Sequence, residues 1–158
     1  MSKAVKSGSL KEVFLAQENN AVSLIFCVIL ALVLPFFLIP IEKYILPWPW
    51  FIEELVKIAV LWYLILPVRC WHCRLWLALA FVLIFSVAEN ILYFPLFVAN
   101  QELGLYWERF IYPLLMHLVT FYLMLFVSWK HKKFIFFAGL LAMLIHYLYN
   151  AKIVYFLH

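Results

Sequence analysis

Five stretches of this 158-residue chain are apolar and long enough to cross a membrane as helices. About 20 consecutive apolar residues span the hydrocarbon core of a bilayer. At these lengths only a helix satisfies its own backbone hydrogen bonds inside lipid. We therefore expect an all-α integral membrane protein, a bundle of about five transmembrane helices. The expected spans run about Ala21 to Ile39, Trp50 to Val68, Leu75 to Ala99, Phe110 to Trp129 and Phe134 to Phe156.

The composition supports this class and leaves little mass outside the membrane. Hydrophobic residues make up 69% of the chain and charged residues 13%, whereas a soluble domain is nearer half apolar and a quarter charged. We expect a single transmembrane domain over residues 1–158, because nothing outside the spans is long enough for a second one. Residues 1–20 are expected to form a cytoplasmic tail or a short surface helix, and the chemistry to lie on the helices between about residues 50 and 156. The first span is expected to act as an uncleaved insertion signal.

The basic residues predict an orientation rather than a nucleic-acid partner. The net charge is +4, but lysines and arginines sit in short loops, where they set topology. With five spans, the positive-inside rule places the N-terminus in the cytoplasm and the C-terminus outside a cell membrane. Eight basic residues then face the cytoplasm and three face outward: Lys3, Lys6, Lys11, Arg69, Arg74, Lys130, Lys132 and Lys133 against Lys43, Arg109 and Lys152.

Four of the five apolar stretches carry acidic, basic or amide side chains. A charge near the middle of a membrane helix costs roughly 2.5–3.5 kcal/mol on insertion scales. Such residues usually serve function and face the interior of a helix bundle. The polar segments are Glu53-Glu54-x-x-Lys57, Glu89-Asn90, His117 and His146-x-x-x-Asn150.

These polar groups converge at one depth. A helix rises ~1.5 Å per residue, which puts all four segments roughly 6–15 Å below the outer surface in the expected orientation. Glu53 and Glu54 stand four and three residues before Lys57, so either can pair with it. His146 and Asn150 share a face of the last span. We expect one pocket in the outer half of the bilayer, into which these groups point.

The ordered motifs resemble the PrsW family of intramembrane proteases, distant relatives of the CAAX-processing (Abi) endopeptidases. The shared pattern is E-E-x-x-K at 53–57, F-x-x-x-E-N at 85–90, Arg109 before His117, and H-x-x-x-N at 146–150. The CAAX relatives instead have E-E-x-x-x-R, which argues against a prenylated substrate. The resemblance implies hydrolysis of peptide bonds in or near the membrane. It also implies a membrane-anchored protein substrate, often one with a single span.

Amide hydrolysis needs an activated water, a stabilised oxyanion and a proton donor for the leaving nitrogen. Glu54 is expected to be the general base, with Glu53 as its neighbour or substitute. The alternative is a structural ion-pair cluster of both glutamates with Lys57. Glu89 is a second water-activating carboxylate, a metal ligand, or a structural partner of Lys57.

The histidines admit two mechanisms and a structural reading. His117 and His146 orient the water, or they bind one zinc ion together with Glu89, since two histidines and a carboxylate make an open zinc site. The cofactor is thus either none or one Zn²⁺; otherwise the two are hydrogen-bonded core histidines. Asn90 and Asn150 donate to the oxyanion or bond between helices. Arg109 contacts substrate or extends to the interface.

Two other classes remain open. Membrane carboxylates and histidines also relay protons in transporters and channels. Five spans are few for an inverted-repeat transporter, and the polar groups form one layer rather than a path. A non-catalytic assembly subunit is the third class. Cys70 and Cys73 form a lone C-x-x-C, for which we expect reduced loop thiols, with a metal or redox role as the alternative.

Overall fold

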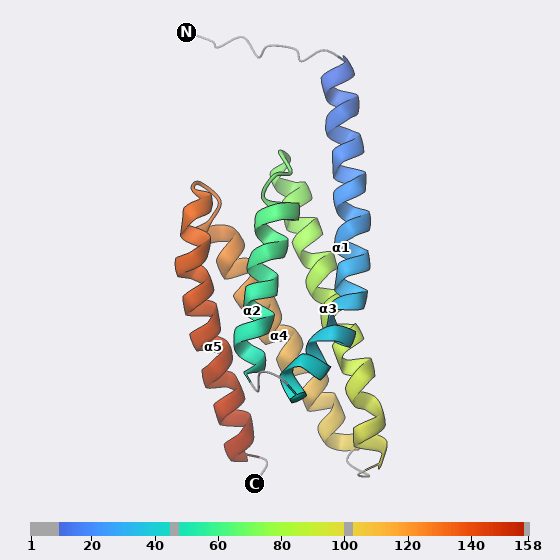
Figure 1. Ribbon diagram of the computed structural model, residues 1–158, viewed down its shortest axis with the longest axis vertical. Helices are drawn as coiled ribbons and strands as arrows, with labels where there is room; N and C mark the ends of the chain where they lie inside the picture. Colours follow the sequence, from blue (N-terminus) through green and yellow to red (C-terminus); the bar gives the residue numbers. More distant parts are fainter. Residues whose placement is uncertain (1–9, 45–47, 100–102, 157–158) are drawn as a thin grey trace.

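The protein is an all-α bundle of five helices (Figure 1). The computed structural model describes residues 10–44, 48–99 and 103–156, and every regular element in these ranges is helical. The expected fold class is therefore confirmed. The elements are α1 (Leu10–Tyr44), α2 (Pro49–Val60), the π-helical turn η1 (Leu61–Ile65), α3 (Trp71–Ala99), α4 (Leu103–Val127), the 3₁₀ turn η2 (Lys132–Phe134) and α5 (Ile135–Phe156).

Four helices are long and apolar enough to cross a membrane, which identifies the chain as a membrane protein. They contain the segments Ala21–Ile41, Trp71–Pro95, Tyr106–Val127 and Lys132–Ala151. Large apolar side chains such as Phe37, Trp76 and Phe137 are exposed on their outer faces. A water-soluble protein rarely exposes apolar surface this continuously, whereas lipid tails match it.

The expected second span, Trp50 to Val68, is shorter than predicted. α2 contributes 12 residues and η1 continues it by 5, ending before Pro67. This continuous helix is about 25 Å long at ~1.5 Å per residue, and it carries three charged side chains. It is therefore too short and too charged to count among the four helices that are long and apolar enough to cross a membrane. Its position in the bundle is nevertheless interior, because its glutamates and lysine are buried.

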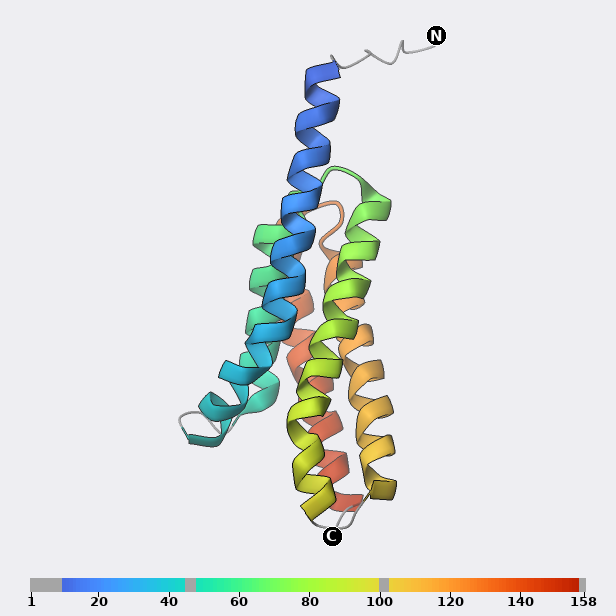
Figure 2. The same ribbon diagram turned by 90° about the vertical axis from the view of Figure 1, so that its right-hand side faces the viewer.

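The N-terminal part of α1 also differs from expectation. Residues 10–20, expected as a tail or a separate surface helix, continue α1, while residues 1–9 lie outside the described ranges. α1 contains Pro35 and Pro40, each of which removes a helical hydrogen bond and bends the helix. Figure 2 shows the resulting curvature at the C-terminal end of α1.

The helices pack side by side in a ring around a shared interior. α3, α4 and α5 follow one another as antiparallel neighbours, α1 packs against α3, and α2 lies between α1 and α5 (Figures 1 and 2). Stacked rings of Phe81, Phe85 and Phe121 fill the core between α3 and α4. The four helices expected to carry polar groups can therefore present them to one interior space.

The state of the two cysteines in the C-x-x-C segment also differs from the expectation. Cys70 and Cys73 were expected as reduced thiols, but a disulfide joins them. Their Cα atoms are 5.1 Å apart, within the range that a disulfide requires. The first turn of α3 produces this short distance, because Cys70 directly precedes the helix and Cys73 lies within its first turn.

Gly139 sets the close approach of α5 to α2. A Cβ at this position would collide with Cδ1 of Ile58 and lie 3.1 Å from its Cγ1. Ile58 is buried on the face of α2 that also carries Glu54. The absence of a side chain at Gly139 therefore helps to bring the polar segments of α2 and α5 together.

We predict that Gly139→Leu destabilises the folded protein by about 1–3 kcal/mol or more through overpacking against Ile58. Ile58→Ala makes room, so the double variant should lose less stability than the sum of the single losses. Thermal unfolding in detergent micelles measures all three. Phe137→Leu, on the exposed face of α5, is the control and should change little. Additive losses at Gly139 and Ile58 would show that this contact does not set the helix spacing.

Candidate active site

Lys57 is the centre of the polar interior. Its side chain is 1% exposed, and Nζ lies 2.6 Å from Oε1 of Glu54 and 2.8 Å from Nδ1 of His117. It also donates to Oγ1 of Thr120 at 3.3 Å. The expected pairing of Lys57 with an acid one turn earlier is confirmed, and Glu54 provides that acid. The lysine thereby joins α2 to α4.

Glu54 joins α2 to α5 as well. Its side chain is fully buried, and Oε1 accepts hydrogen bonds from Lys57, from Nδ1 of His146 at 3.0 Å and from Thr120 at 3.3 Å. Oε2 has no hydrogen-bond donor within the part of the chain that the structure describes. A carboxylate oxygen has two lone pairs, so three donors fully occupy Oε1. Glu54 thus contacts α4 and α5 through Oε1.

Lys57 fixes the tautomer of His117. An ammonium group only donates, so Nδ1 of His117 must accept, and the ring proton is assigned to Nε2. Nε2 then donates to Oε2 of Glu89 at 3.0 Å. Oε1 of Glu89 lies 3.8 Å from Nη2 of Arg109, whose guanidinium stacks 3.9 Å from the ring centre of Tyr93. Both ring nitrogens of His117 and both oxygens of Glu89 therefore face identified groups.

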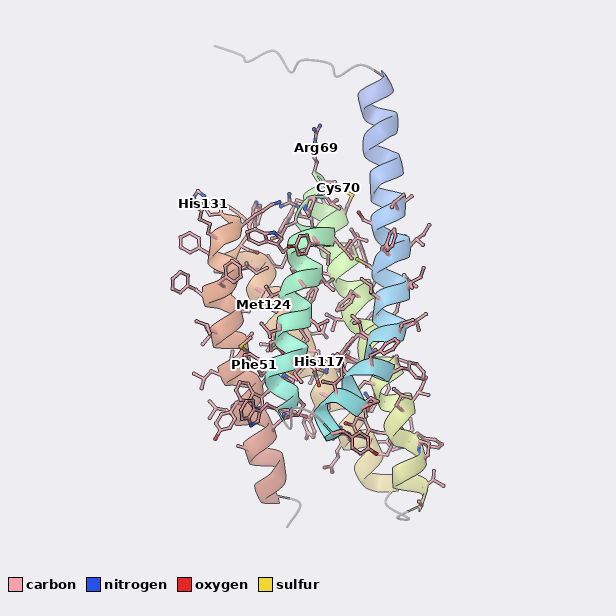
Figure 3. The ribbon with its side chains drawn as sticks, viewed as in Figure 1. Phe51, Arg69, Cys70, His117, Met124 and His131 are labelled. Atoms are coloured by element: carbon pink, nitrogen blue, oxygen red, sulfur yellow. A yellow bond between two sulfur atoms is a disulfide. The ribbon has the colours of Figure 1, made fainter. Side chains whose placement is uncertain are left out.

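Glu53, Glu89 and His117 cluster together. One potential ligand atom from each residue lies within 4.8 Å of the other two. Nε2 of His117 contacts Oε2 of Glu89 directly at 3.0 Å, and Oε2 of Glu53 lies 3.8 Å from Nδ1 of His117. All three side chains are nearly buried, and they come from α2, α3 and α4. Figure 3 shows His117 inside the bundle, at about the level of Phe51 on α2.

The expected zinc ligands His117, His146 and Glu89 do not gather as a set. His146 instead bonds to Glu54, and Glu53 takes its place beside Glu89 and His117. Two carboxylates and an imidazole are chemically suited to zinc. However, the imidazole lone pair at Nδ1 faces the ammonium of Lys57 at 2.8 Å, and that positive charge opposes a divalent cation. As arranged, these residues do not fit a zinc ion.

The remaining predicted residues lie nearby with different contacts. Nδ2 of Asn90 donates to the backbone carbonyl of Ser86 at 2.7 Å, so this amide bonds within its own helix. Asn150 lies half-buried one turn after His146, and its side-chain amide makes no hydrogen bond to the other described residues. Arg109 lies beside Glu89, as described above. Thr120 was missed by sequence reasoning, although its position three residues after His117 puts it on the same face of α4.

An apolar groove lies between the same two helices as the Glu54–His146 bond. It has a volume of about 450 Å³ and opens between α2 and α5. Trp50 and Tyr147 meet across it with ring centroids 5.6 Å apart. Its lining consists of Trp50, Phe51, Leu140, Met143, Leu144 and Tyr147.

Comparison with protein-family models, curated proteins and solved structures finds no match to this chain.

We predict that Lys57→Met destabilises the protein by about 3–5 kcal/mol, because it leaves the buried carboxylate of Glu54 without its cation. The double variant Lys57→Met/Glu54→Gln removes both charges and should recover a large part of that loss. Thermal unfolding in lipid nanodiscs compares the two. A double variant no more stable than Lys57→Met would show that the charge pair does not control stability.

Proposed function

We propose that this protein is an intramembrane endopeptidase that hydrolyses peptide bonds of membrane-anchored proteins without a metal ion. The clustering of Glu53, Glu89 and His117, with one potential ligand atom of each within 4.8 Å of the other two, carries the proposal. Buried acid and imidazole groups on three helices are costly, and such groups in membranes usually mark functional sites. The resemblance of four ordered motifs to PrsW-type proteases supports the same reaction class.

The water-activating base in this proposal is Glu53, with Glu54 in a positioning role. Oε1 of Glu54 already accepts from Lys57, His146 and Thr120, so Glu54 holds α2, α4 and α5 in place. Glu53 instead clusters with Glu89 and His117, within 4.8 Å of a potential ligand atom of each. A carboxylate within hydrogen-bond distance of a bound water is the geometry that general-base catalysis needs.

The other polar groups have complementary roles. Nε2–H of His117 is held by Glu89 and orients the imidazole beside the water. Lys57 and Arg109 supply positive charge near the developing oxyanion, and Asn150 offers an amide donor one turn from His146. Since Nδ1–H of His146 bonds to Glu54, its Nε2 carries a lone pair that can receive a proton and pass it to the leaving nitrogen.

The proposed setting follows from the basic residues. The positive-inside rule places the start of α1 in the cytoplasm, so the site lies in the outer half of a cell membrane. The substrate is a membrane-anchored protein with a single span, and the bilayer is the other partner. A proton- or cation-coupled transporter would need polar groups in a path across the membrane, whereas Glu53, Glu89 and His117 cluster together.

We expect Glu53→Gln to lower the cleavage rate about 10²–10⁴-fold while leaving thermal stability nearly unchanged, because it removes the base and keeps the side-chain shape. Glu54→Gln is the matched comparison and should lower stability and cleavage together, since it weakens the bonds to Lys57 and His146. Purified protein in liposomes with a panel of single-span substrates provides the assay.

Full activity of Glu53→Gln would reject the proposed base. If Glu54→Gln alone abolished cleavage at unchanged stability, the base would be Glu54. Proton flux through the liposomes, with no cleavage of any substrate in the panel, would favour the transport function instead.

We further predict that a strong chelator such as EDTA or 1,10-phenanthroline leaves cleavage unchanged, because Lys57 occupies the face of His117 that a metal ion would need. Elemental analysis of the same sample should find less than one equivalent of zinc. Loss of activity with chelator, restored by added zinc alone, would contradict the metal-free mechanism.

A further inference from the structure

Cys70 and Cys73 lie outside the candidate active site, at the start of α3, and are joined by a disulfide. A metal role for this pair finds no support, because the described residues that converge as potential metal ligands are Glu53, Glu89 and His117. The neighbouring His72 and both cysteines contribute nothing to that group. We therefore consider thiol–disulfide chemistry as the role of this pair.

Cys70 lies at the start of α3, where its sulfur contacts the helix backbone. The backbone N–H of Cys73 donates to Sγ of Cys70 at 3.2 Å, so this sulfur caps the first turn of α3. Amide groups at a helix N-terminus carry partial positive charge. The thiolate is the attacking form of a cysteine in thiol–disulfide exchange, and the N–H groups at this helix start are placed to hydrogen-bond the sulfur of Cys70.

Two arginines add positive charge around the pair and fix the loop. Arg69 directly precedes Cys70, and its side chain extends away from the end of the bundle (Figure 3). Nε of Arg74 donates to the backbone carbonyl of Val68 at 2.5 Å, which holds the chain on both sides of the disulfide. Trp71, between the cysteines, stacks on Trp129 with ring centroids 3.7 Å apart. The pair thus sits on a rigid platform at the end of the bundle.

The two cysteines differ in solvent exposure. Cys70 is exposed, whereas Cys73 is half-buried. A reacting partner can therefore reach Cys70 directly, while Cys73 is placed to attack a disulfide formed there. This division into an attacking and a resolving cysteine is what thiol–disulfide exchange requires.

The expected compartment favours a reversible bridge. The orientation proposed above puts the loop before α3 on the cytoplasmic side. Disulfides there are usually transient, because cellular thiols reduce structural ones. A bridged and accessible C-x-x-C in that compartment fits exchange better than permanent cross-linking.

We propose that Cys70 and Cys73 form a redox-active pair that exchanges electrons with thiol–disulfide partners at the membrane surface, with Cys70 as the attacking thiol. The thiolate of Cys70 attacks one sulfur of a partner disulfide; the partner S–S bond breaks, and the first partner thiolate leaves and takes a proton. The thiolate of Cys73 then attacks Sγ of Cys70, which forms the observed bridge and releases the second partner thiolate. Two electrons pass to the partner, and a dithiol partner reverses the sequence. This activity does not depend on the proposed proteolysis.

The first test equilibrates the unsubstituted protein in lipid nanodiscs with graded ratios of reduced to oxidised glutathione, and separately of dithiothreitol. Acid quenching, maleimide labelling and peptide mass spectrometry then count free thiols at Cys70 and Cys73, while buried Cys27 reports on the rest of the chain. We expect the two thiols to appear together in one two-electron transition in both series. A transition with dithiothreitol alone would show that the partner must be a dithiol.

If the disulfide stays intact through both the glutathione and the dithiothreitol series, the proposal is wrong. It is also wrong if both cysteines stay reduced through both series. Glu53→Gln should show the same transition as the unsubstituted protein, which separates this result from the outcome of the protease tests.

The second test compares Cys73→Ser, which leaves Cys70, with Cys70→Ser, which leaves Cys73. We expect Cys70 to form a mixed disulfide with oxidised glutathione about tenfold faster than Cys73 does, because its sulfur lies at the helix start and the residue is exposed. Thermal unfolding confirms that both variants are folded. Equal rates, or a faster Cys73, would overturn the assignment of the attacking thiol.

Discussion

The buried ion pair between Lys57 and Glu54 is the interaction on which the polar interior depends. An uncompensated charge in this setting costs several kcal/mol, and the pair is tolerated because further hydrogen bonds satisfy it. His117 and Thr120 of α4 and His146 of α5 provide them. The short, charged α2 is thereby held inside the bundle, between α1 and α5, although its composition alone disfavours lipid.

The same pair shapes the chemistry that the site can perform. Because Lys57 takes the lone pair at Nδ1 of His117, the ring proton faces Glu89, and Glu89 in turn lies beside Glu53 and Arg109. The two carboxylates that cluster with His117 are Glu53 and Glu89. The positive charge of buried Lys57 thus favours catalysis by the carboxylates and disfavours the binding of a metal ion beside His117.

Much of the architecture was predictable because hydropathy is a local property. Four of the five expected spans correspond to long apolar helices, and the polar residues on α2 to α5 do meet in the interior. The errors concern features that hydropathy does not report. The helix over Trp50–Val68 ends early, before Pro67, residues 10–20 extend α1, and Cys70 and Cys73 are bridged. The orientation across the membrane and the protease function remain proposals.

The sequence by itself determined that the chain forms membrane helices and that its costly polar groups must face one another, because lipid offers them no other partners. Only the tertiary structure decided which groups meet. Glu54 pairs with Lys57, His146 bonds to Glu54 and packs edge-to-face against the ring of His117, and Thr120 enters the network. These choices depend on how each helix is rotated and how closely α5 approaches α2 at Gly139, and such packing between distant segments is not encoded in any local pattern.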